Sequence, residues 1–324
     1  MMKKILFSKA GGPDVLEYVD TDLAPPGQGE VRIRHTAIGL NYVDTYYRSG
    51  LYPTPMPSGL GNEAAGVIEE LGQGVKGFKV GDRVAYGSGP LGAYAQARNF
   101  PANRLVKLPK SISDETAAAM MLKGMTVRYL LRATYKVKRG QTVLFHAAAG
   151  GVGLIFSQWA KALGVKVIGT VGSPEKMELA YAHGCTHVIN NRTEDVAARV
   201  REITKGKGVP VVYDGVGQAT LQGSLDSLSV RGLLVSFGNA SGAIKDFQLG
   251  QLAAKGSLYV TRPTLYSYII TDEEFKQTAG DVVDIVKSGK VKIQINQRYK
   301  LADAAQAHRD LESGKTTGST ILTV

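Results

Sequence analysis

The segment HAAAGGVGLIFSQWAKALGVKVIGT, residues 146–170, constrains the fold of this chain more than any other stretch. A β-like run over residues 142–146 leads into three glycines, Gly150, Gly151 and Gly153. A helix follows, with apolar residues at the 3.6-residue spacing of one face, and a second apolar run covers residues 165–171. Strand, glycine turn, helix and strand in this order predict a βαβ unit, the building block of a parallel sheet.

The same alternation of strands and helices continues along the middle of the chain. Helix-like segments cover residues 174–183, 195–204 and 218–228, and strand-like segments cover residues 187–189, 210–213, 232–237 and 257–260. This rhythm predicts an α/β fold with a doubly wound parallel sheet of the Rossmann type.

The chain before residue 111 has a different texture. Short strand-like runs cover residues 31–37, 64–71, 82–86 and 93–98, with glycines between them. Residues 31–37 alternate apolar and polar, which is typical of a half-buried strand, and we predict a partly open β-barrel for this region. The chain end adds predicted helices over 273–288 and 302–312 and strands over 293–299 and 319–324. A length of 324 residues favours two domains.

Composition argues against several other classes of protein. The single cysteine, Cys185, cannot form an intramolecular disulfide or a multi-cysteine zinc site, and it favours a reducing, cytoplasmic compartment. No window reaches 18 apolar residues, so we expect no membrane-spanning helix. The net charge of +11 comes from 39 basic and 28 acidic residues that are scattered along the chain. Nucleic-acid binding is therefore not favoured.

The glycine turn is suited to bind the pyrophosphate of a dinucleotide. Backbone amides at the start of a helix point at such a group, and the helix dipole favours its negative charge. The missing side chain at Gly150 or Gly151 lets the diphosphate approach, and Gly153 lets the helix pack on the sheet. The alternative is a helix start that merely needs small residues.

The tip of the second strand indicates which dinucleotide is expected. An NAD site places Asp or Glu there to bind the ribose 2′-hydroxyl, whereas this tip is Gly172 and Ser173. The missing acid, with Lys176 and Arg192 nearby, favours NADPH, because an acid would repel its 2′-phosphate. Glu175 is interpreted as an acid in the first turn of the following helix. Lys176 can alternatively be a solvent-exposed helix lysine that does not contact the phosphate.

Seven segments spread over the whole chain resemble one family. They are GPDVLEYVD (12–20), GLNYVDTYYRSGLY (39–52), GNEAAGVI (61–68), HAAAGGVG (146–153), VYDGVG (212–217), VTRPTL (260–265) and KTTGSTIL (315–322). In this combination the chain resembles the zinc-independent quinone oxidoreductases, the zeta-crystallin-like branch of the medium-chain dehydrogenase/reductase superfamily.

The resemblance implies two domains and a dimer. A GroES-like catalytic domain would comprise residues 1–124 and 265–324, and a Rossmann dinucleotide-binding domain residues 125–264. The resemblance also implies a homodimer joined through edge strands of the Rossmann domain, with residues 257–264 as the candidate edge.

The chain departs from its zinc-dependent relatives at the metal site. Gly61-Asn62-Glu63 stands where those relatives carry a metal-ligand histidine, and Asn41 stands near the place of their zinc cysteine. The five histidines show no metal-ligand spacing either, so we expect no metal. Asn191 stands where relatives often have an aromatic residue, which implies a different contact with the adenosine end of the cofactor.

The resemblance implies roles at the reacting end for Asn41, Tyr46 and Arg262. Tyr52 is added as a catalytic candidate because it belongs to the aromatic lining that residues 41–52 offer to a substrate. Asn41 and Tyr46 are also expected to contact the cofactor, together with Ala149, Gly150, Gly151, Val152, Gly153, Gly172, Ser173, Lys176, Asn191, Arg192, Gly215, Phe237, Gly238, Ser241, Leu265 and Lys315. Alternatives stay open: the tyrosines can simply pack at the barrel edge, Arg262 can bond loop carbonyls, and Asp44 can either orient Tyr46 or cap a turn.

The favoured function is an NADPH-dependent quinone reductase without a metal, with the quinone bound between the two domains. A quinone is already a strong acceptor, so the protein has mainly to align it with the nicotinamide and exclude water. One alternative is an enoyl or 2-alkenal reductase in which Tyr46 donates a proton. Another is a protein that keeps the cofactor fold but binds RNA or has a structural role.

Overall fold

The computed structural model describes residues 2–245 and 247–324, and the chain divides into two compact units. The first comprises residues 1–125, 269–287 and 293–324, and the second comprises residues 126–268 and 288–292. The first boundary falls inside helix α2 (Asp114–Tyr129), which ends in a π-helical turn at Leu130–Thr134. The domain limits expected at 124/125 and 264/265 are a prediction from the family resemblance alone.

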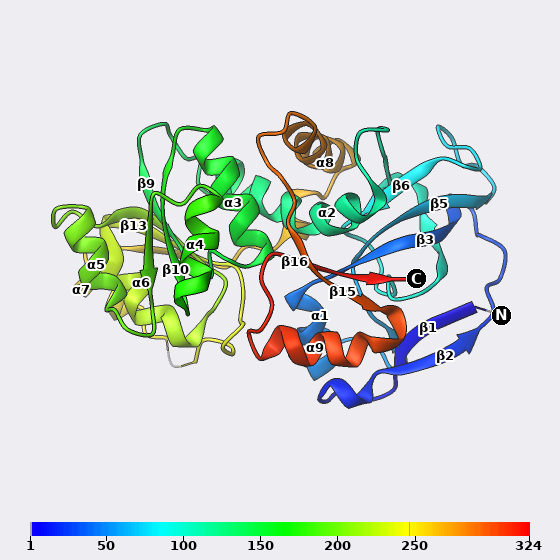
Figure 1. The fold of residues 1–324 in the computed structure, drawn as a ribbon, viewed down its shortest axis with the longest axis horizontal. Coiled ribbons are helices and arrows are strands. Elements are labelled where there is room, and N and C mark those ends of the chain that lie inside the picture. Colours follow the sequence, from blue (N-terminus) through cyan, green and yellow to red (C-terminus); the bar gives the residue numbers. More distant parts are fainter. Residues whose placement is uncertain (1, 246) are drawn as a thin grey trace. The chain divides into compact units, whose positions relative to one another are not determined.

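The second unit is built on a six-stranded parallel sheet (Figure 1). The strand order is β11 (His187–Asn190), β10 (Lys166–Val171), β9 (Thr142–Phe145), β12 (Val209–Asp214), β13 (Leu228–Ser236) and β14 (Tyr259–Thr261). Every neighbouring pair is parallel. The order reverses between β9 and β12, and ligands of such sheets bind at the carboxyl ends of the strands at this switch point. The predicted doubly wound sheet is thus confirmed.

Helices return the chain between these strands. They are α3 (Gly151–Ala162), α4 (Pro174–Ala182), α5 (Val196–Ile203), α6 (Leu221–Ser227) and α7 (Gly250–Ala254). Strand residues Leu144, Ile168 and Val212 pack with helix residues Val200 and Leu225 in one buried cluster. The predicted helix over 218–228 begins as a 3₁₀ turn at Gln218–Thr220, and α6 follows that turn.

The first unit is rich in β-structure and joins both ends of the chain. One sheet has the order β2 (Glu17–Thr21), β1 (Met2–Phe7) and β4 (Ser58–Gly59). The other runs from β15 (Ile295–Lys300) through β16 (Ser319–Thr323), β3 (Glu30–Leu40), β5 (Glu63–Leu71) and β6 (Arg83–Tyr86) to β8 (Val106–Lys107), with β7 (Ala97–Pro101) beside β3. β16 pairs antiparallel with β3, so the chain end completes the sheet that the first hundred residues begin (Figure 1).

The core of this unit lies under β3. Ile33 and Ile38 are fully buried and pack with Phe7, Tyr86 and Phe100. The predicted alternation of β3 is confirmed, because buried residues alternate with partly or fully exposed ones from Val31 to Ala37. Three further helices are α1 (Tyr42–Ser49), α8 (Asp272–Lys287) and α9 (Ala304–Glu312).

Two local predictions need correction. The strand expected over residues 93–98 begins only at Ala97, because residues 93–95 turn back and Ala95 forms no more than a single bridge with Lys4. Helix α1 was not expected, since its tyrosines suggested only a pocket lining. Among the described residues, no helix is both long enough and apolar enough to cross a bilayer.

Candidate functional site

The glycine turn follows β9 and leads into α3. Ala147 adopts a left-handed backbone with φ 57°, and its carbonyl oxygen accepts a hydrogen bond from the Gly150 N–H at 3.0 Å. A Cβ atom on Gly153 would lie 2.6 Å from the carbonyl oxygens of both Ala147 and Ala148. Only glycine fits there, and the close approach brings the first turn of α3 against the strand end. Gly151, Val152 and Gly153 thus present amides where an anion can bind.

A buried network holds this turn. The Ser224 hydroxyl donates to Asp214 Oδ2 at 2.7 Å, so its oxygen is free to accept from His146 Nε2 at 2.9 Å. His146 Nδ1 then accepts from the Thr170 hydroxyl at 3.0 Å. Burial lowers the pKa of His146, against the opposing effect of Asp214, and keeps the ring neutral. The network connects the ends of β9, β10 and β12 through side chains that sequence reasoning did not single out.

The residues predicted to bind the 2′-phosphate follow the ends of β10 and β11. A Cβ atom on Gly172 would lie 3.4 Å from Arg192 Nε and 3.7 Å from Asn191 Oδ1. Ser173 is the N-cap of α4, whose first turn carries Lys176. Arg192 is exposed, and none of the residues in the described ranges accepts a hydrogen bond from its guanidinium. The strand tip therefore presents a positive group and no acid of its own.

Glu175 is a negative group in the first turn of α4, directly after this tip. A hydrogen bond from the Ser173 side chain lowers the pKa of the Glu175 carboxyl, as expected of a first-turn acid. The carboxylate is fully exposed, so solvent screens its charge.

Gly215, Phe237 and Gly238 lie together at the ends of β12 and β13. A Cβ atom on Gly238 would lie 2.3 Å from the Gly215 carbonyl oxygen, and one on Gly215 would lie 2.9 Å from the Phe237 ring. Ser241 ties the loop to its neighbour, because its hydroxyl donates to the Val216 carbonyl at 2.9 Å and accepts from the Ala219 N–H at 3.0 Å. These strand ends border the switch point.

Arg262 bonds to the same loop. Its Nη1 donates to the Ser236 carbonyl oxygen at 2.9 Å, and its Nη2 donates to Asn239 Oδ1 at 3.0 Å once that amide is oriented to satisfy both of its ends. These contacts favour a structural role in the described structure, and the catalytic role of Arg262 stays a prediction. Leu265 is buried nearby in the chain, at the start of a 3₁₀ turn.

The first unit carries the other predicted residues. Asn41 is the N-cap of α1, and its Nδ2 donates to Glu63 Oε2 at 2.8 Å. Glu63 is fully buried, and Lys123 Nζ lies 3.2 Å from the same oxygen and 3.2 Å from the Leu40 carbonyl oxygen. The buried ion pair fixes the orientation of the Asn41 amide. Sequence reasoning missed Lys123, although a lysine inside the apolar run AAAMMLKGM was a visible signal.

Three of the predicted residues thus come together on α1 and the following turn. The Tyr46 and Tyr52 ring centroids are 5.2 Å apart, edge to face, and the Tyr52 N–H donates to the Tyr46 carbonyl at 3.0 Å. Tyr46 is largely buried, with 7% of its surface exposed. Lys315 also belongs to the first unit, where its exposed ammonium lies 3.7 Å from Asp310 Oδ1.

Asp44 caps the turn that carries this cluster. Its Oδ2 accepts from the Asn41 N–H at 2.9 Å, which selects the capping interpretation of this residue. Burial raises the pKa of Asp44 to about 6, although hydrogen bonds from Asn41, Asn62 and Tyr94 and the charge of Lys123 act in the opposite direction.

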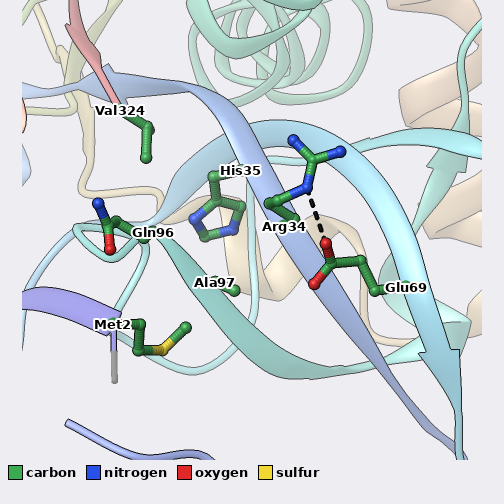
Figure 2. A pocket seen from close by; sticks show the side chains of 7 residues that line it. All are labelled: Met2, Arg34, His35, Glu69, Gln96, Ala97 and Val324. Carbon is green, nitrogen blue, oxygen red and sulfur yellow. Dashed lines mark hydrogen bonds and ion pairs between the residues drawn. The ribbon is translucent and has the colours of Figure 1, made fainter.

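A separate surface hollow of about 390 Å³ contains none of the predicted site residues (Figure 2). Its lining residues are Met2, Arg34, His35, Glu69, Gln96, Ala97 and Val324. Arg34 pairs with Glu69 at 2.7 Å, and His35 contacts the Ala95 carbonyl oxygen at 2.7 Å and the Tyr86 hydroxyl at 2.9 Å. The polar groups named here thus bond to one another, to the backbone or to the Tyr86 hydroxyl. Within the described part of the chain, no group of three His, Cys, Asp or Glu side chains is placed to hold a metal.

The fit of Gly153 can be tested by substitution. Gly153→Ala places a methyl group against two backbone carbonyls, so we expect the second unit to lose about 1–3 kcal/mol of stability. Gly223→Ala in α6 is the matched control, because a Cβ atom there meets nothing within 4 Å and helix propensity adds up to about 1 kcal/mol. Trp159, the single tryptophan, lies on α3 and reports urea unfolding of this unit by fluorescence. Equal stability of the two variants would contradict the packing argument.

Comparison with known proteins identifies the family. The family described as "Alcohol dehydrogenase GroES-like domain" matches residues 27–110, and "Zinc-binding dehydrogenase" matches residues 151–284. A "Quinone oxidoreductase" of Pseudomonas aeruginosa is 57% identical over 323 residues, 99% of each chain, and a "2-haloacrylate reductase" of a Burkholderia species is 46% identical over 99% of each chain. The structure of the Escherichia coli quinone oxidoreductase complexed with NADPH superposes with a TM-score of 0.98 at 52% identity, covering 99% of this chain and 100% of that one. The chain therefore belongs to the quinone oxidoreductase family of the medium-chain dehydrogenase/reductase superfamily.

Proposed function

We propose that this protein is an NADPH-dependent quinone reductase. The observation that carries the proposal is the acid-free tip of β10 beside the glycine turn, where Gly172 lies next to the cationic Arg192 and Ser173 is the N-cap of α4. Relatives at 52–57% identity bear the name quinone oxidoreductase, and the solved structure of one of them holds NADPH. When bound, NADPH supplies the reducing equivalents that a quinone accepts.

The second unit would hold the cofactor. The amides of Gly151, Val152 and Gly153 would bind the pyrophosphate. The feature of this structure that fits a pyrophosphate is the tight turn before α3, which the missing side chain of Gly153 allows. Arg192 and Lys176 would pair with the 2′-phosphate, while Asn191 would contact the adenosine end without stacking on it. Gly215, Phe237, Gly238 and Ser241 would border the cofactor at the switch point.

The first unit would supply the reacting end. We assign contacts with the nicotinamide and the substrate to Asn41, Tyr46 and Tyr52, because α1 and the turn after it present an oriented amide and packed phenol rings together. The Glu63–Lys123 pair would keep Asn41 in place rather than touch the substrate. Lys315 and Leu265 would complete the cofactor contacts.

Arg192 tests the cofactor preference. Arg192→Ala removes a charge-assisted hydrogen bond to a phosphate, so the Kd for NADPH should rise about tenfold while the Kd for NADH changes little. Titration of the nicotinamide fluorescence measures both constants. Lys166→Ala, which removes a positive charge at the opposite, amino end of β10, should leave both unchanged. A parallel loss of affinity for NADH would contradict the assignment of Arg192 to the 2′-phosphate.

Substrate class is tested by comparing quinones with enones. Incubation with NADPH and 1,4-benzoquinone should consume NADPH well above the spontaneous rate, and a lack of consumption would exclude the main proposal. An enoyl reductase is the second candidate, which the 46% identity with a 2-haloacrylate reductase favours. Enone turnover that exceeds quinone turnover and disappears in Tyr46→Phe would select this second function, because reduction of a C=C bond needs a proton donor.

We propose a homodimer through β14. This strand is the outer edge of the six-stranded sheet, and Tyr259 and Val260 expose 60% and 38% of their surfaces. An exposed edge with apolar side chains favours pairing with another chain. Sedimentation velocity should give a dimer for the wild type and a monomer for Val260→Glu, whereas Val80→Glu in the first unit should remain dimeric. A dimeric Val260→Glu variant would place the interface elsewhere.

We also infer a cytoplasmic location, because Cys185 is a free, buried thiol. Recovery of the native protein in an extracellular or periplasmic fraction would contradict it.

A further inference from the structure

A line of buried side chains connects α9 with α1 in the first unit. Arg48 Nη1 lies 3.1 Å from His308 Nδ1, and His308 Nε2 lies 3.2 Å from the Tyr94 hydroxyl oxygen. That hydroxyl lies 2.9 Å from Asp44 Oδ2. The exposed fraction of these four residues is 2% or less. The line therefore runs through the interior of the unit and ends directly under Asn41.

The hydrogen bonds of this line have one direction. A guanidinium can only donate, so His308 Nδ1 is the acceptor from Arg48 and carries no proton. Burial, and to a lesser extent the charge of Arg48, lowers the pKa of His308 to about 3, so the ring is neutral and its proton is on Nε2. His308 Nε2–H donates to the oxygen of Tyr94, and the Tyr94 hydroxyl donates to Asp44.

Asp44 is the acceptor on which these bonds converge. Its Oδ2 accepts from Tyr94 and from the Asn41 N–H, and its Oδ1 accepts from Asn62 Nδ2 at 2.9 Å. An ionised carboxylate can accept all three bonds. A protonated one turns one oxygen into a donor, and one of the three groups then loses its partner.

The other end of the line is anchored by an ion pair. Arg48 Nη2 and Nη1 lie 2.6 Å and 2.9 Å from the two carboxylate oxygens of Glu312, and Arg48 Nε donates to the Gly11 carbonyl at 3.0 Å. A bidentate pair of this kind fixes the plane of the guanidinium. Arg48 consequently keeps one N–H directed at His308, which leaves that ring a single tautomer.

We propose that His308 and Tyr94 are positioning residues of the active site, which hold Asp44 as an ionised acceptor and thereby fix Asn41 and the start of α1. The proposal rests on the proposed function in so far as Asn41 and Tyr46 take part in the reaction. The charged groups that face this cluster are Lys123 on α2, which favours ionised Asp44, Glu63 on β5, which pairs with Lys123, and the Arg48–Glu312 pair. Tyr94 itself stays protonated, because burial and the Asp44 charge raise its pKa.

The tautomer of His308 is the first test. Histidine labelled with ¹⁵N should show the Nε2–H form for this residue, without titration between pH 5.5 and pH 8.5. An Nδ1–H form, or titration in the ordinary range of histidine, would overturn the proposal. This measurement does not depend on any catalytic activity.

The second test follows the Asn41 backbone amide resonance against pH. The Asn41 N–H donates to Asp44, so the chemical shift of this amide should follow the ionisation of the Asp44 carboxyl. Tyr94→Phe removes one donor from Asp44, and the midpoint should rise by about half a pH unit or more. His308→Leu should shift the midpoint in the same direction by a smaller amount, and serves if Tyr94→Phe does not fold. Tyr86→Phe is the matched control, because it removes a buried hydroxyl that is bonded to His35 instead, and it should leave the midpoint unchanged.

The acid limb of kcat/KM for 1,4-benzoquinone should move with the same midpoint in Tyr94→Phe and stay in place in Tyr86→Phe. An Asn41 midpoint that stays unchanged in both Tyr94→Phe and His308→Leu would overturn the positioning role, whatever the substrate. If the midpoint shifts in Tyr94→Phe but the wild-type protein does not reduce quinones, the proposed function is contradicted while the positioning network stands.

Discussion

The close approach of α3 to the end of β9 is the constraint on which the candidate cofactor site depends. Gly153 allows this approach, because any side chain there would meet the carbonyl oxygens of Ala147 and Ala148. The approach directs the first amides of α3 toward the switch point of the sheet. Ala147 adopts a left-handed backbone conformation in this turn. The network from His146 through Ser224 to Asp214 holds the flanking strand ends in place. A tight turn of this kind thus needs support from side chains far along the chain.

The first unit depends on the compensation of buried charges. Glu63 and Lys123 neutralise each other and orient Asn41, while Asp44 is stabilised by donors from Asn41, Asn62 and Tyr94. Removal of one partner from such a cluster leaves an uncompensated charge in the interior, which costs much more than the pair contributes. The same arrangement holds the N-terminus of α1 through the bonds from Asn41 to Asp44 and to Glu63, and the proposed roles of Asn41 and Tyr46 depend on that placement.

Prediction from the sequence worked where the signal is local. The βαβ rhythm gave the parallel sheet, and the two-residue alternation of residues 31–37 placed β3 correctly. The strand predicted over residues 93–98 was wrong for residues 93–95. Their backbone groups bond to distant loops instead, as the Tyr94 N–H does to the Leu60 carbonyl. Helix α1 was missed because its capping pair, Asn41 and Asp44, lies in a run of tyrosines that also suits an extended pocket wall.

The sequence by itself determined that the chain forms a doubly wound sheet with a glycine turn, and that the tip of its second strand lacks an acid. These properties follow from residue order and from short-range sterics, which periodicity and glycine spacing report directly. Only the tertiary structure decided that Lys123 neutralises Glu63, that Arg262 bonds to Ser236, and that Arg48 sets the tautomer of His308. Those contacts join residues between 26 and 260 positions apart, and no local pattern of side chains specifies such pairs.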